Sequence, residues 1–169
     1  IERYQILNNR LKCNDSATTK LFHINIACTT REILHEKIIN QGIIAINEGS
    51  QYWSDTYFTG AVIKGSSELQ VTYTRDDFFV SAKYTFIGRN KPTLIGKLKT
   101  KMVKKYGPEN TQTGEEKQGP MSVEWIMDDN IHLTLSRSWP DTTTYVEYFS
   151  PEKRLLLEIQ QKQSSDKSF

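Results

Sequence analysis

The spacing of apolar and polar side chains changes between two periods along the chain. Residues 20–27 (KLFHINIA) alternate for most of their length, which predicts a half-buried strand. Residues 29–42 follow with apolar side chains at helical spacing, a threonine that can cap the helix and a glycine that can end it. The same order returns later, because residues 80–86 alternate as a strand and residues 92–107 predict a second helix that also ends at a glycine.

Similar strands follow each predicted helix. Two strands joined by turn residues and then a third strand are expected at residues 61–74 and 78–86, and again at 123–136 and 142–149. When Tyr84 is aligned with Tyr148, Ala82 falls opposite Val146, so the inward positions agree in character. We therefore expect an α+β protein of two tandem αβββ units with antiparallel sheets, each covered by its helix.

The end of the chain departs from this repeat. Ser150 is a candidate N-cap, Pro151 suits the first helical position, and the two together predict a C-terminal helix. A final strand is the competing interpretation, since short apolar runs are ambiguous. The expected organisation is a first unit with an N-terminal extension at 1–88, a second unit with the C-terminal helix at 89–163, and a frayed tail at 164–169.

The order of elements over residues 30–85 and 92–149 resembles a known architecture. Two tandem units, each a helix packed on a short antiparallel sheet, are similar to the β-lactamase inhibitor proteins and to small envelope modules of the outer-membrane assembly lipoprotein type. The resemblance implies an exported protein, periplasmic or secreted, that binds another protein without catalysis. Inhibitors, immunity proteins and envelope-assembly proteins belong to this class of function.

Composition adds few restrictions. The chain has 169 residues, 25% of them charged, with a net charge of +2 and a mean hydropathy of −0.58. No run approaches the roughly 20 apolar residues of a membrane span, so we expect membrane contact only at a peripheral surface. The two cysteines, Cys13 and Cys28, predict a disulfide in an exported protein, worth on the order of 3 kcal/mol. In a cytosolic protein they would be two unrelated buried thiols.

Catalytic, metal and cofactor signatures are missing from the sequence. Neither cysteine has a Cys or His partner at ligand spacing, and no nucleotide-binding or hydrolase motif occurs. We therefore expect no metal, no cofactor and no enzyme activity. The alternative is a small hydrolase or transferase with its site between the two sheets, because catalytic residues can lie far apart in sequence.

Aromatic residues between the first helix and its strands form the first binding candidate. Tyr52, Trp53, Tyr57 and Phe58 lie close together in residues 48–60 (EGSQYWSDTYFTG). They predict an added edge strand or an exposed binding patch, since Tyr and Trp are favoured at interface centres. The competing interpretation is that they fill the seam between the two units.

Two further features complete the binding candidates. Trp139, next to Pro140 at a strand junction, is a second exposed aromatic, and residues 108–120 predict a mobile polar loop. On the second helix, Lys97, Lys101 and Lys104 suit an acidic protein or, alternatively, anionic lipid or nucleic acid. Because no aromatics lie among the lysines to stack on bases, we expect a protein partner and no nucleic acid.

Overall fold

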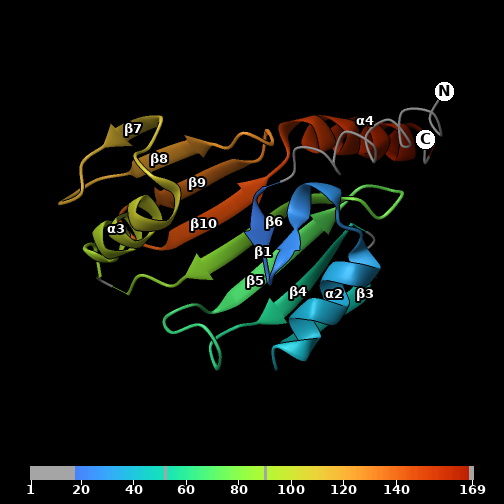
Figure 1. Ribbon diagram of the computed structural model, residues 1–169, viewed down its shortest axis with the longest axis horizontal. Coiled ribbons are helices and arrows are strands. Elements are labelled where there is room, and N and C mark those ends of the chain that lie inside the picture. Colours follow the sequence, from blue (N-terminus) through green and yellow to red (C-terminus); the bar gives the residue numbers. More distant parts are fainter. Residues whose placement is uncertain (1–17, 52, 90, 168–169) are drawn as a thin grey trace.

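The computed structural model describes residues 18–51, 53–89 and 91–167. It shows an α+β protein whose large antiparallel sheet has the strand order β3-β4-β5-β6-β10-β9-β8-β7 (Figure 1). The strands are β3 (Ile44–Gln51), β4 (Ser54–Phe58), β5 (Glu68–Tyr73), β6 (Phe79–Phe86), β7 (Thr111–Gly114), β8 (Met121–Ile126), β9 (His132–Arg137) and β10 (Thr144–Phe149).

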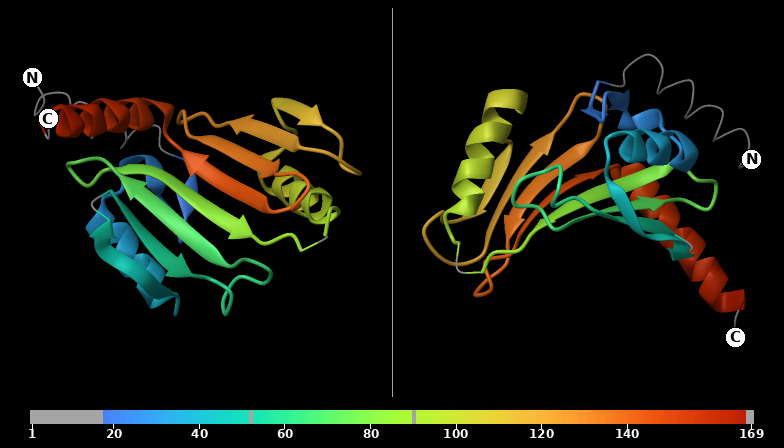
Figure 2. Two further views of the ribbon diagram at one scale, coloured as in Figure 1. Left: turned by 180° about the vertical axis from the view of Figure 1, so that it is seen from behind. Right: turned by 90° about the horizontal axis from the view of Figure 1, so that it is seen from below.

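Helices lie on both sides of this sheet. The helices and the small ribbon are β1 (Lys20–Leu21), β2 (Ile24–Asn25), the 3-10 turn η1 (Ile26–Cys28), α2 (Arg31–Asn40), α3 (Leu94–Tyr106) and α4 (Pro151–Lys167). Figure 2 shows α2, α3 and the β1–β2 ribbon on one side of the sheet, while α4 projects from the opposite side. No helix of the described chain has the length and apolar character needed to cross a bilayer.

Local signals explain where the helices begin and end. Gly107 follows α3 with a φ of 85°, a conformation that glycine adopts without strain, and its N–H donates to the carbonyl of Val103 at 2.8 Å. Ser150 precedes α4 and its Oγ accepts from the N–H of Lys153 at 3.2 Å, as the predicted N-cap requires. The C-terminal helix is thus confirmed, and it continues to Lys167.

Alternation along the strands produces one apolar face beneath α2 and α3. In β5 every second residue from Leu69 to Tyr73 is fully buried, while the residues between them are half-buried. The same face continues across β6 and β10, where Tyr84 lies opposite Val146. The resulting core runs under both helices without a break.

Our expectation of three-stranded sheets needs correction. Four strands follow each of α2 and α3, and the last strand of each set, β6 or β10, pairs with the other, from Phe86 opposite Thr144 to Ser81 opposite Phe149. This pairing removes two open edges and joins the apolar faces into one core, which physically favours one continuous sheet.

Three segments differ from the predicted elements. Residues 43–58 contain the β3–β4 hairpin, whereas residues 61–63, expected as a strand, belong to the loop between β4 and β5. The predicted strand over 20–27 is instead the short β1–β2 ribbon, because Phe22 and His23 turn the chain with φ of 50° and 67°.

Candidate functional site

The aromatic segment does not form one exposed patch. β4 lies between β3 and β5, so it is an inner strand whose successive side chains point to opposite faces. Tyr57 is 0% exposed in the core, Phe58 is 45% exposed, and Trp53 is half-buried in the turn before β4. Tyr52 lies outside the described residues. The proposed patch is therefore wrong for Tyr57, which partners cannot reach in the folded protein.

Tyr57 belongs to a polar network under α2. Its Oη lies 2.7 Å from Nδ1 of His35. Beside this pair, Arg31 Nε donates to Asp55 Oδ2 at 3.0 Å and Arg31 Nη2 donates to Asp55 Oδ1 at 2.6 Å. The Arg31 guanidinium also lies 5.1 Å from the centre of the Tyr73 ring. Hydrogen bonding to Asp55 raises the pKa of Arg31, and burial raises the pKa of Tyr73. This network holds α2 on β4 and β5.

Trp139 lies in the turn between β9 and β10 and is 43% exposed. The guanidinium of Arg137 lies 5.4 Å from its ring centre. Arg137 is almost fully buried and donates to the carbonyls of Gly119, Pro92, Glu116 and Glu115. The segment 108–120, expected to be mobile, is therefore anchored by Arg137 and contains β7.

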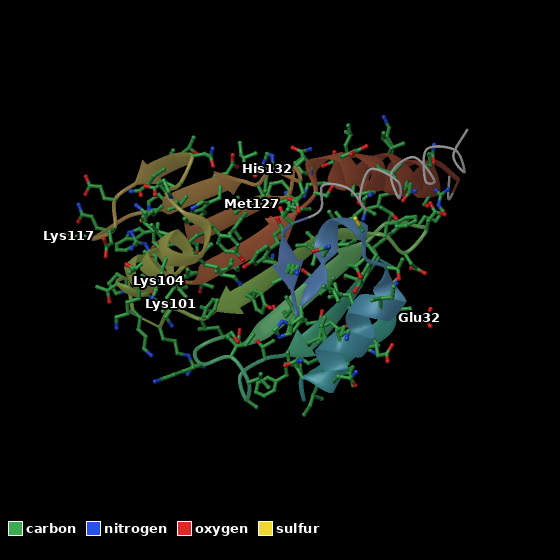
Figure 3. All side chains as sticks on the ribbon, viewed as in Figure 1. Glu32, Lys101, Lys104, Lys117, Met127 and His132 are labelled. Carbon is green, nitrogen blue, oxygen red and sulfur yellow. The ribbon has the colours of Figure 1, made fainter. Side chains whose placement is uncertain are left out.

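The predicted lysines of α3 separate into two groups. Lys97 and Lys101 line a groove of about 810 Å³ between α3 and the β4–β5 loop, whereas Lys104 is exposed but does not line it. Figure 3 labels Lys101 and Lys104 beside α3. We call this feature the lysine groove; its lining residues are Lys64, Gly65, Phe86, Lys91, Thr93, Leu94, Lys97, Leu98, Thr100 and Lys101.

The lysine groove combines an apolar floor with a cationic rim. Phe86, Leu94 and Leu98 form the floor, and the lining found among the described residues includes no carboxylate. The rim consists of Lys64, Lys91, Lys97 and Lys101, and none of these four lysines makes a salt bridge with another described residue. Lys99, on the same helix, differs, because its Nζ lies 2.9 Å from Glu109 Oε1 and 2.6 Å from Gln112 Oε1. The hydrogen bond from Lys99 lowers the pKa of Glu109.

The loop between β4 and β5 supplies one wall of the groove. Hydrogen bonds within the loop and to β6 fix it. Ser66 Oγ donates to Thr59 Oγ1 at 2.6 Å, and Ser67 N donates to the carbonyl of Thr85 in β6 at 2.8 Å. Gly65 has a φ of +86°, and a Cβ there would lie 3.7 Å from the Phe86 ring. The backbone therefore crosses closely over the groove floor at a position suited to glycine.

A second, smaller cavity of about 300 Å³ lies beside the ribbon. It is lined by Lys20, Leu21, Phe22, His23, Gln41 and Lys105. Gln41 caps the C-terminal end of α2, and Lys105 lies in the last turn of α3. The positive charge of Lys105 complements the negative C-terminal end of the α3 dipole, which gives this lysine a structural role.

Sequence reasoning identified the lysines of α3 but not the opposite wall of the groove. Lys64 and Gly65 lie in a loop of nine residues, 59–67, whereas the corresponding loop between β8 and β9 has five, 127–131. That difference was a usable signal, since long hairpin loops often carry function. Cys28 precedes α2, but Cys13 lies outside the described residues, so their disulfide stays a prediction.

Metal ligands are not gathered in this fold as far as it is described. In residues 18–51, 53–89 and 91–167, no three His, Cys, Asp or Glu side chains form a group able to hold a metal ion. His35 contacts Tyr57, and His132 contacts the ring of Phe149 at 5.3 Å between centroids.

Comparison with known proteins assigns no family. No protein-family profile matches the chain, and no curated protein matches it. Among solved structures, the chain is similar to a DUF4309 family protein, YjgB from Bacillus subtilis subsp. subtilis str. 168. The TM-score is 0.48 and the identity 14%, over 86% of this chain and 95% of that one. At this level the similarity carries no argument about what the chain does.

Proposed function

We propose that the chain is a non-enzymatic binding module that takes an acidic segment of a protein partner into the lysine groove. One observation carries the proposal: four lysines surround an apolar floor, and no carboxylate of the groove lining neutralises them. An anionic partner would therefore meet several cations around one apolar surface, which favours its binding electrostatically.

Charge and shape favour binding over simple solvation of the lysines. Lysines on an ordinary soluble helix face project into water, whereas Lys97 and Lys101 border a concave surface that Lys64 and Lys91 complete from other segments. Concave apolar sites with a few convergent polar groups are the usual form of binding pockets. The rim would steer an acidic segment, and the floor would bury its apolar side chains.

We also propose that α2 with β3–β6 and α3 with β7–β10 are the two units of a repeat, each with four strands. The register supports this: Tyr84 lies opposite Val146, and Ala82 lies opposite Tyr148. If Tyr84 and Tyr148 are equivalent positions of the repeat, Ala82 and Val146 are equivalent as well. A twofold axis between β6 and β10 would then convert the pair Tyr84–Val146 into the pair Tyr148–Ala82, and both pairs are present. Only the first unit has the longer loop that forms the groove wall, so the proposed site would occur once.

Export remains part of the proposal, together with the disulfide between Cys13 and Cys28. It rests on the paired cysteines and on the resemblance to exported binding modules. Titration of thiols in denatured, unreduced protein from its native compartment tests it. Two reactive thiols would contradict the disulfide.

The proposed function is tested by charge reversal with a matched control. Wild-type protein, a Lys97→Glu/Lys101→Glu variant and a Lys37→Glu/Lys104→Glu variant are used to capture partners from extract of the source cells. Both variants change the net charge equally, and all four lysines are exposed. Circular dichroism checks that each variant is folded.

We expect the groove variant to lose a partner that the wild type and the control variant retain. Two rim charges that each contribute about 0.2–1 kcal/mol, and then repel when reversed, should weaken binding about tenfold or more. Added salt should weaken wild-type capture as well. Equal capture by all three proteins would contradict the proposal.

A further inference from the structure

We propose that the groove recognises a specific pattern: one bulky apolar side chain flanked on both sides by carboxylates. This inference rests on the proposed function and adds the chemistry of the bound segment. It follows from the lining of the groove, in which Lys97 and Lys101 of α3 and Lys64 of the β4–β5 loop border the apolar floor.

The floor accepts an apolar side chain. Leu94 and Leu98 lie on the same side of α3, four residues apart, and Phe86 ends β6 beneath them. Both leucines are half-buried, so part of their surface faces the groove. A large apolar side chain placed there would leave water and contact three apolar neighbours, an effect that typically changes affinity tenfold or more.

The rim accepts carboxylates at two places. Lys97 and Lys101 also lie four residues apart on α3, which separates them by about 6 Å along the helix. Lys64 approaches from the β4–β5 loop and Lys91 from the segment before α3. Cations on more than one side of an apolar floor match a segment whose acidic residues lie both before and after its apolar residue.

The volume of the groove and the number of separate cations around it favour a protein segment over a lipid. A cavity of about 810 Å³ lies towards the upper end of the range of about 300–1,000 Å³ that is usual for ligand pockets. Lysines on separate elements can each pair with a separate carboxylate, whereas a single fatty acid carries one anionic group. Anionic vesicles and a fatty acid are therefore the alternatives that the experiment must separate from a peptide.

The test uses the full chain and three labelled peptides in fluorescence anisotropy. The first peptide has one phenylalanine with two glutamates on each side, the second replaces the phenylalanine by serine, and the third replaces the glutamates by glutamines. We expect the first to bind, and the other two to bind about tenfold more weakly or worse. Salt should weaken only the peptides that carry glutamates.

Protein variants locate the binding. Thr100 is exposed at the groove, so Thr100→Trp should fill it without disturbing the core and should weaken the first peptide. Lys97→Glu/Lys101→Glu should do the same, whereas Lys37→Glu/Lys104→Glu should bind as the wild type does. Phosphatidylglycerol vesicles and palmitate should not displace the peptide.

Several results would overturn the inference. Equal affinity of the phenylalanine and serine peptides would remove the apolar anchor, and displacement by vesicles or palmitate would assign the groove to lipid. If no peptide binds while partner capture still depends on Lys97 and Lys101, the pattern is wrong and the proposed function stands. If capture is also independent of these lysines, both proposals fail.

Discussion

Replacing Tyr73 by phenylalanine should leave the protein as stable as the wild type or stabilise it. Tyr73 is 0% exposed, and its Oη has no hydrogen-bond partner among the residues that the structure describes. A buried polar group without a partner costs about 1–3 kcal/mol. The substitution removes that group and keeps the ring beneath the Arg31 guanidinium, 5.1 Å away. We expect the free energy of unfolding to rise by up to about 2 kcal/mol.

Tyr57→Phe is the matched control, because Tyr57 is equally buried but its Oη lies 2.7 Å from His35 Nδ1. Losing that contact should lower the free energy of unfolding by about 1 kcal/mol, or the melting temperature by about 2–4 °C. Urea unfolding followed by tryptophan fluorescence gives the free energy of unfolding of each variant, provided that its dependence on denaturant concentration is unchanged. Destabilisation of Tyr73→Phe by more than about 1 kcal/mol would refute this reasoning.

Two other predictions concern the core and the segment before β8. Burial raises the pKa of both Tyr84 and Tyr148 above the ordinary value of about 10, so the fold favours their protonated forms. Stability should be complete below about pH 10 and fall as the pH rises further; urea unfolding across this range checks it, and a flat profile would contradict it. Arg137→Met removes the donors to four carbonyls, so we expect a loss of about 3 kcal/mol and faster proteolysis within residues 108–120. Unchanged stability and cleavage would show that Arg137 does not hold this segment.

Periodicity predicted the regular elements well where one face of an element is buried. The spacing of apolar residues in residues 29–42 and 92–107 identified α2 and α3, and alternation identified β5, β6 and β8 to β10. The helix-start signal at Ser150 and Pro151 identified α4. In each case the local pattern agrees with the tertiary packing.

Sequence reasoning failed where pairing partners decide the structure. The aromatics near Tyr57 could not be assigned to a face, because their burial depends on β3 and β5 pairing on either side of β4. The polar sequence of residues 108–120 predicts a mobile loop. In the structure, Arg137 of β9 holds this segment by donating to the carbonyls of Glu115 and Glu116. Similarly, Lys97 and Lys101 were recognisable as basic, but the groove needs Lys64 from a loop more than thirty positions earlier in the chain.

Lysine labelling on the captured complex tests the central claim most directly. Acetylation of each lysine, quantified by mass spectrometry with and without the partner, reports which side chains the partner covers. We predict slower labelling of Lys64, Lys91, Lys97 and Lys101 in the complex, with Lys37 and Lys104 unchanged because they lie outside the groove lining. Equal labelling of the groove lysines in free and bound protein would contradict the account.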